Sequence, residues 1–325
     1  MDNRLTKILP THHALYQQLF NPTATTTTYR NARFSAATQK AYVSDMVHFL
    51  QHGGPLPATP AMVEAYLNQY AAQYKPDTLK RRLVALRLWH HAHDAPDPTR
   101  HVSVVSTMQG ITRTWGAPVQ KAKALRLKHF KAVLAAIQTQ PNTLLAYRDR
   151  ALFLVGFFGS LRRSELVAIE LEYVEFAEEG MVIVLRDTKG DRVKKGEPCT
   201  SPLGPDHCCP VRALLEWLRV SNITRGAVFR RVSKSGRVLM PRPHISGHHW
   251  NHLFKQYVAK AHLRTAERFS SHSLRGGFAT EAARKGASLD AIQRHGRWKS
   301  TKVVVGYIEA GRQFADSAVH ALFEF

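Results

Sequence analysis

The sequence has few cysteines, few acidic residues and no long apolar run, and each shortage excludes a class of protein. The three cysteines, Cys199, Cys208 and Cys209, are odd in number and include an adjacent pair, which is not the pattern of a disulfide framework. A reducing compartment fits this usage. No run of about 18 apolar residues is present, so we expect no membrane span. The start, MDNRLTKILPTHH, lacks the apolar stretch of a signal peptide.

Motifs for metal binding are incomplete. His248 and His252 stand four residues apart, but the glutamate of an HExxH motif is missing and no third ligand is evident. His207, Cys208 and Cys209 lack a CxxC partner. We therefore expect no bound metal.

Positive charge is abundant. Lysine plus arginine number 46 against 24 acidic residues, which gives a formal charge of +22 and a pI near 10.3. The chain has 325 residues, 44% of them hydrophobic, which is enough for two domains with separate cores. Basic proteins include ribosomal and membrane-associated ones. Here the charge is spread over a chain of normal core content, which favours a folded nucleic-acid-binding protein.

The first part of the chain predicts an arm followed by a small helical domain. Residues 1–29 are expected to be a flexible arm because they are threonine-rich, although Leu15, Leu19 and Phe20 can form a short docked helix. Residues 30–112 show helical periodicity. The expected helix starts are Ser35, Thr59-Pro60, and Asp77 or Thr78, with a further short helix over 102–111.

The third of these helices carries a run of basic residues. Leu79, Leu83, Leu86 and His90 share one face, and the basic residues lie mostly off it, namely Lys80, Arg81, Arg82 and Arg87. Such a run is either a solvated face or a set of contacts to phosphates and the major groove, and both interpretations stay open here.

Residues 113–123, RTWGAPVQKAK, are expected to be the linker. Its lysines, Lys121 and Lys123, suit a chain that passes close to DNA, although plain connection is the alternative. Residues 124–325 then form a second, mostly helical domain. Residues 180–186 read as a strand, residues 187–191 as a turn, and Arg192 begins a return strand, so we expect a small antiparallel sheet.

Four chemical motifs follow one another in this second domain. They are Arg162 in GSLRRSE, His272 and Arg275 in HSLR, Trp298, and Tyr307 nine residues later. Nine residues on one straight helix put two side chains about half a turn apart. Both reach one target only if the chain breaks between them, and the polar run from Lys299 to Thr301 is suited to such a break. The alternative is a buried strand over 303–305 with Tyr307 in the core.

Together these motifs resemble the tyrosine recombinases, the phage integrase family, and in particular its Cre-like members. The resemblance runs from about Phe34 to the end of the chain. It implies a mainly α fold in which two domains clamp a duplex as a C shape. The N-terminal core-binding domain would be helical, and the catalytic domain mostly helical with a small antiparallel β-sheet.

The residue types fit phosphoryl transfer by a protein nucleophile. Two guanidiniums, Arg162 and Arg275, suit the charge of a pentacovalent phosphate, and Glu165 can fix Arg162 by an ion pair. His272 lies one helical turn from Arg275 and suits proton transfer near neutral pH. The Tyr307 phenol needs a base or a cationic site to attack.

The resemblance adds roles that the residues alone do not give. It implies a 3′-phosphotyrosyl link and a free 5′-hydroxyl, with neither metal nor ATP. A lysine on a β-hairpin turn protonates the leaving oxygen in the family, which here best matches Lys189, with Lys194 and Lys195 on the same hairpin. Trp298 stands where most members have histidine, so it should position and pack. His295 is read as structural or DNA-facing.

Helix position and the resemblance indicate DNA contacts at Thr38, Lys40, Lys80, Arg81, Arg82, Arg87, Lys121, Lys123 and His244. After Tyr307, an apolar stripe of Ala315, Val319, Leu322 and Phe323 either packs on its own domain or, as in Cre-like enzymes, docks on a neighbouring subunit. The second option gives a homotetramer on two double-stranded DNA recombination sites.

We therefore expect a cytoplasmic, nucleoid-associated enzyme that performs site-specific DNA recombination without a cofactor. Two alternatives remain at this stage. A type IB topoisomerase uses similar chemistry to relax supercoils, and a non-catalytic DNA-binding regulator could share the scaffold.

Overall fold

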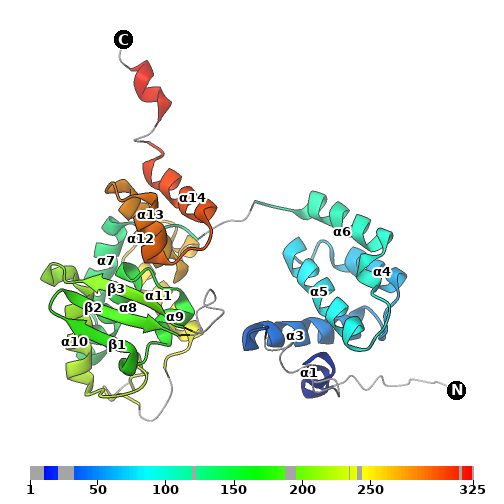
Figure 1. The fold of residues 1–325 in the computed structure, drawn as a ribbon, viewed down its shortest axis with the longest axis horizontal. Helices are drawn as coiled ribbons and strands as arrows, with labels where there is room; N and C mark the ends of the chain where they lie inside the picture. The colour runs from blue at the N-terminus through cyan, green and yellow to red at the C-terminus, as the bar shows by residue number, and fades with distance from the viewer. Residues whose placement is uncertain are drawn as a thin grey trace. The chain divides into compact units, whose positions relative to one another are not determined.

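We describe the protein from a computed structural model, in residues 11–20, 33–118, 122–186, 195–233, 235–239, 244–314 and 317–323. The chain divides into two compact units, Met1–Val119 and Gln120–Phe325. Both are drawn in Figure 1, and each is described by itself.

The first unit is all helical in its described residues. Its elements are α1 (His12–Phe20), α3 (Ala36–His52), α4 (Pro60–Tyr70), α5 (Pro76–Ala92), the 3-10 helix η1 (Pro98–Arg100) and α6 (Val102–Trp115). The Ser35 and Thr59 side chains cap α3 and α4 by accepting hydrogen bonds from the backbone N–H of Thr38 and Met62, as the sequence predicted.

The ends of two helices differ from the expectation. Helix α5 begins at Pro76 with Lys75 at the N-cap, so the predicted cap at Asp77 or Thr78 is wrong; proline suits the first helical position because it has no N–H to leave unpaired. Helix α6 continues to Trp115, so the first three residues of the expected linker, 113–115, are helical.

Helix α1 lies within the expected arm and is docked. Leu15, Leu19 and Phe20 are buried in the same core as Met46 and Phe49 of α3, because these apolar side chains fall on one face of the helix. The short docked helix predicted inside residues 1–29 is therefore confirmed.

The second unit is mostly helical around one small sheet. Its helices are α7 (Leu127–Gln138), α8 (Thr143–Phe158), α9 (Arg163–Val167), α10 (Pro210–Ser221), α11 (Gly247–Lys260), α12 (His272–Arg284), α13 (Leu289–Gly296) and α14 (Thr301–Arg312). Short 3-10 helices are η2 (Leu171–Tyr173), η3 (Asp206–Cys208), η4 (Ala266–Arg268) and η5 (Ala318–Leu322). In the described part of the chain, no helix is long and apolar enough to cross a membrane.

The sheet is antiparallel in the order β1-β2-β3, with β1 (Val174–Ala177), β2 (Gly180–Leu185) and β3 (Glu197–Pro202). Met181 pairs with Phe176 and Ile183 with Cys199, so the alternate residues Met181 and Ile183 face the core. The mainly α fold with a small antiparallel sheet is thus confirmed. The tip between β2 and β3, residues 187–194, lies outside the described residues.

Helix α8 is the centre of this unit. Residues 151–157 are all buried, because the helix is apolar on every side and contacts α7, α10 and α12. Its C-terminal end leads into the first of the motifs found in the sequence.

Helices α12, α13 and α14 enclose a smaller core at one end of the unit (Figure 1). Ala279, Ala283, Ile292 and Val304 fill it, and Trp298 and Tyr307 pack against it. Residues 303–305 belong to α14, so the alternative of a buried strand is wrong.

Candidate active site

A tight turn after α8 forms the floor of the site. Gly159 ends the helix, and Ser160 adopts a left-handed backbone conformation with φ 48°. The turn directs two carbonyls at buried arginines. Arg275 donates to the Ser160 carbonyl, and Arg297 donates to those of Gly159 (3.2 Å) and Ser160 (3.4 Å).

Arg162 follows this turn at the N-cap of α9. The buried carboxylate of Glu165 accepts a hydrogen bond from the Arg162 backbone N–H at 2.9 Å and another from its guanidinium. The ion pair expected between these two residues is present. The Arg162 side chain keeps 22% of its surface exposed, so it is oriented yet accessible to a ligand.

His272 and Arg275 occupy the first turn of α12. The helix start is fixed by Asn251, whose side-chain oxygen accepts from the Ser271 N–H and hydroxyl, both at 3.1 Å. Arg275 is buried, and its guanidinium carbon lies 4.1 Å from the centre of the Trp298 ring. Burial, reinforced by the charge of Arg162, lowers the pKa of Arg275 to about 10, which leaves it a cation at neutral pH.

His272 is partly accessible but surrounded by positive charge. Protein atoms displace part of its water, and Arg275, Arg162 and Arg163 repel a proton, so the pKa of His272 is lowered from its ordinary 6.5. The ring is therefore neutral at pH 7 and can accept a proton.

Trp298 and Tyr307 meet because the chain breaks between them. Arg297 ends α13 in the left-handed conformation, and Ser300 stands at the N-cap of α14. The two ring centres lie 5.7 Å apart, as the phase argument from the sequence required. Tyr307 also lies against Gly276, where an added Cβ would be 3.1 Å from its ring. Burial raises the pKa of Tyr307, and the Arg275 charge opposes that rise.

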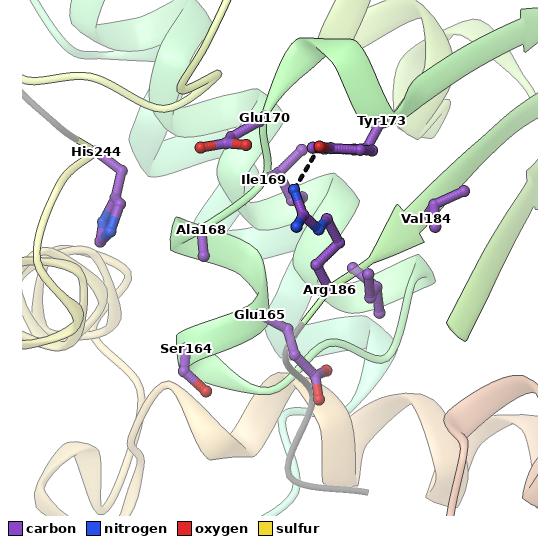
Figure 2. Close-up of a pocket in the computed structure, with 10 residues that line it drawn as sticks. Ser164, Glu165, Ala168, Ile169, Glu170, Tyr173, Val184, Arg186 and His244 are labelled. Carbon is purple, nitrogen blue, oxygen red and sulfur yellow. Dashed lines mark hydrogen bonds between the residues drawn. The ribbon is translucent and has the colours of Figure 1, made fainter. Parts of the chain in front are cut away.

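A cavity of about 370 Å³ lies beside this cluster and is lined by Glu165. Figure 2 shows Arg186 reaching into it from the end of β2 and donating to the Tyr173 hydroxyl, with His244 on the other side. His244 is exposed, and its Nδ1 lies 2.8 Å from the Ile245 carbonyl. The predicted DNA-contact residue His244 is thus close to the candidate active site.

The other DNA-contact candidates differ in their exposure and in their partners. Thr38, Lys40 and Lys80 lie at the surface or partly exposed, and Lys123 is exposed with its ammonium 3.3 Å from the Thr265 hydroxyl. Arg81 and Arg87 are partly exposed but held by acidic partners, Asp45 at 2.7 Å and Asp97 at 3.2 Å. Lys121 and the candidate acid Lys189 lie outside the described residues.

Arg82 does not fit the prediction of direct DNA contact. It is only 6% exposed, donates to the Tyr66 hydroxyl at 2.7 Å and lies 3.9 Å from the Tyr74 ring centre. Tyr66 of α4, Tyr74 after α4 and Asp45 of α3 surround this guanidinium inside the unit, so it does not reach the surface.

Sequence reasoning missed Arg297 and Cys199. Arg297 contacts the Gly159–Ser160 turn, and its left-handed conformation gave no signal in the sequence. The buried Cys199 thiol lies 3.4 Å from the Gly159 carbonyl, and burial raises the pKa of that thiol. Among the described residues, no group of three His, Cys, Asp or Glu side chains is placed to hold a metal ion.

Residues 123–313 match the phage integrase family. The chain is also 35% identical over 295 residues to an integrase/recombinase XerD homolog of Selenomonas ruminantium. The matched region covers 88% of this chain and 85% of the relative. The chain belongs to the phage integrase family. This membership confirms the resemblance to the tyrosine recombinases and the expectation of a site-specific recombination enzyme.

Solved structures agree with this family fold. The XerH site-specific recombinase in a post-cleavage complex is 16% identical, with a TM-score of 0.65, covering 92% of this chain and 84% of XerH. A lambda integrase dimer bound to a core site is 14% identical, with a TM-score of 0.60, covering 94% of this chain and 80% of the integrase.

Proposed function

We propose that this phage integrase family member cleaves and rejoins DNA strands at a specific site through a phosphotyrosyl intermediate on Tyr307. The observation that carries the proposal is that Trp298 contacts both Arg275 and Tyr307, while Arg275 donates to the turn that presents Arg162. A phenol, two guanidiniums and a neutral imidazole at one place fit attack on a phosphodiester.

In the cleavage step, the Tyr307 oxygen attacks phosphorus. A Tyr307 O–P bond forms, the bond from phosphorus to the 5′-oxygen breaks, and His272 accepts the phenol proton. Arg162 and Arg275 donate to the non-bridging oxygens, where charge accumulates. The leaving 5′-oxygen takes a proton from Lys189, the role that the family resemblance assigns to it. Rejoining is the reverse reaction with the 5′-hydroxyl of another strand, so the bond energy stays in the covalent link.

Trp298 and Glu165 support this step without exchanging protons. The Glu165 carboxylate pairs with the Arg162 guanidinium and also accepts a hydrogen bond from the Arg162 backbone N–H. The two contacts fix both the side chain and the backbone of Arg162. The Trp298 ring packs against both Arg275 and Tyr307, and its indole N–H suits donation to the phosphate.

The DNA would be bound by both units, in the cytoplasm at the nucleoid. The formal charge of +22 supports strong, salt-dependent binding of the duplex. We propose phosphate or base contacts at the accessible candidates Thr38, Lys40, Lys80, Arg81, Arg87, Lys123 and His244, together with Lys121. Arg82 would act indirectly, by packing α5 onto α4.

Two copies of the protein on each of two DNA sites would form a homotetramer. Apolar side chains that follow α14 support this, since Phe314 is 80% exposed, Leu322 67% and Phe323 70%. A lambda integrase that is 15% identical, with a TM-score of 0.60, has been solved as a tetramer on a Holliday junction.

The test uses labelled, nicked DNA fragments from the region flanking the gene, mixed with wild type and Tyr307→Phe without metal. A denaturing gel should show a protein–DNA adduct with wild type only. An adduct with both proteins would assign the attack to another residue. Tight binding without any adduct would favour a regulator, and relaxation of supercoiled DNA by a monomer would favour a topoisomerase.

A further inference from the structure

The C-terminal end of α8 is buried against the segment that leads to Tyr307. Carbonyls at a helix end have no partner within the helix, and they carry the negative end of its dipole. Here three successive carbonyls receive donors from distant elements. His295 Nε2 lies 2.6 Å from the Phe158 carbonyl, so its Nε2 must carry the proton, and Arg297 donates to the carbonyls of Gly159 and Ser160.

Arg297 makes these contacts from an unfavourable backbone conformation. Its φ of 56° is left-handed, which residues with a Cβ rarely adopt. The side chain is nevertheless only 7% exposed. It also donates to the His295 carbonyl at 2.8 Å and lies 3.6 Å from the Glu165 carboxylate. Such a conformation persists only where the surrounding contacts hold it.

These contacts join the two halves of the candidate active site. Arg297 directly precedes Trp298, against which Tyr307 packs. At its other end, Arg297 shares the Glu165 carboxylate with Arg162 and shares the Ser160 carbonyl with Arg275. One side chain therefore links the segment that carries Tyr307 to the turn that carries Arg162.

We propose that Arg297 is a positioning residue that sets the distance between Tyr307 and the phosphate-binding arginines. The proposal rests on the proposed function of those residues. Arg297 itself is too buried to touch DNA, so its loss should slow the chemical step and leave DNA affinity intact. Arginine suits the task because its planar group stays charged and donates in several directions at once.

The left-handed backbone allows the side chain to be tested apart from the fold. Arg297→Gly removes every contact of the guanidinium but places glycine where φ is positive, which relieves the backbone. Arg297→Lys keeps the charge and loses the planar fork. Arg294→Ala is the matched control, because Arg294 lies on the same helix, is 75% exposed and pairs with Asp290 at the surface.

Two measurements are made on the full-length protein. Hydrogen exchange of the free protein should show faster exchange over α14 in Arg297→Gly and unchanged exchange over α10. With saturating nicked DNA from the gene's flanks, adduct formation should slow by about 10- to 100-fold, as expected for a nucleophile displaced by about 1 Å, with the same Kd as wild type. Arg297→Lys should keep part of the wild-type rate of adduct formation. The control Arg294→Ala should form the adduct at the wild-type rate.

Two results would overturn the proposal. The first is a wild-type adduct rate in Arg297→Gly with unchanged exchange over α14. The second is an equal loss of rate in Arg297→Gly and Arg297→Lys together with weakened DNA binding, which would make Arg297 a DNA contact or a general stabiliser. If wild type forms no adduct, the proposed function fails, and the exchange data still decide whether Arg297 anchors α14.

Discussion

At the scale of single residues, the site depends on one buried carboxylate among several arginines. Glu165 pairs with Arg162 and lies 3.6 Å from Arg297. Burial lowers the pKa of the nearby Arg275, and the negative charge of Glu165 offsets part of that decrease. Grouped guanidiniums repel one another, and their charge prepares the site for a phosphate. The Glu165 carboxylate offsets part of this repulsion.

Glu165→Gln should therefore destabilise the protein strongly. It leaves buried guanidiniums without their counter-charge, and breaking a buried ion pair in this way costs about 3 kcal/mol. Urea unfolding followed by circular dichroism measures the loss. Glu216→Gln is the matched control, because Glu216 is 44% exposed in its pair with Arg150, and a surface pair is worth less than about 1 kcal/mol. Equal losses in the two variants would contradict this account.

His48 in the first unit should remain neutral well below pH 6. Its Nδ1 lies 2.8 Å from the Tyr66 hydroxyl and its Nε2 3.0 Å from that of Tyr74. Burial, followed by the charge of Arg82, lowers the pKa of His48 from 6.5 to about 4.

Because the unfolded chain keeps the ordinary pKa, it takes up this proton first as the pH falls. The contribution of His48 to stability is therefore full above about pH 6.5 and decreases from there down to about pH 4. An NMR titration should give a midpoint near 4 for the His48 ring. A midpoint at 6.5 or above would show that the network with Tyr66 and Tyr74 does not form.

At the scale of elements, local sequence signals predicted where most helices begin, but they did not predict which side chains meet between helices. Ser35 and Thr59 correctly predicted the starts of α3 and α4, because an N-cap side chain bonds a backbone N–H only a few residues away in the sequence. The break between Trp298 and Tyr307 followed from helix phase alone. In contrast, the burial of Arg82 depends on Tyr66 and Asp45 from other helices, and no pattern within α5 reveals it.

The candidate site shows the same division. Arg162, Glu165, His272, Arg275 and Tyr307 were found from motif order. The structure places Arg162, Glu165 and Arg275 at the turn after α8, and Arg275 contacts the Trp298 ring against which Tyr307 packs. Arg297 was missed because its contacts join residues more than 130 positions apart in the chain, as the separation from Gly159 shows. Its role follows only from tertiary structure.

Helix α12 should tolerate no side chain at Gly277. An added Cβ would lie 2.2 Å from the Leu125 carbonyl oxygen, and the Leu125 N–H is bound to Ser273 of the same helix at 2.9 Å. Gly277→Ala should therefore cost about 1–3 kcal/mol through overpacking. Gly306→Ala in α14 meets nothing within 4 Å and should instead stabilise by about 0.5–1 kcal/mol. Thermal unfolding of both variants checks the opposite signs, and a stabilised Gly277→Ala would refute the close packing.

At the scale of the whole molecule, each unit has its own core, and the chain ends in an apolar segment. Phe314, Val319, Leu322 and Phe323 are 47–80% exposed, whereas the core of α12–α14 is closed without them. Exposed apolar side chains at one end of a chain are typical of a contact with another subunit. This supports assembly of several copies on DNA.

Removal of residues 314–325 should separate assembly from folding. The shortened protein keeps α14 complete, so its melting temperature and its binding to a single site should match wild type. Sedimentation with two DNA sites should show loss of the tetramer. Phe176→Ser controls for general surface apolarity, because Phe176 is exposed on β1 far from this segment in sequence. A truncated protein that still forms tetramers would contradict the proposed role.

The central claim is that Tyr307 becomes covalently joined to the 3′ end of the cut strand. The most direct measurement is to trap the adduct on nicked DNA, digest it with protease and nuclease, and identify the modified peptide by mass spectrometry. The account predicts a phosphorylated Tyr307 in the α14 peptide and a free 5′-hydroxyl on the released strand. A modification on another residue, or a link through a 5′-phosphate, would contradict it.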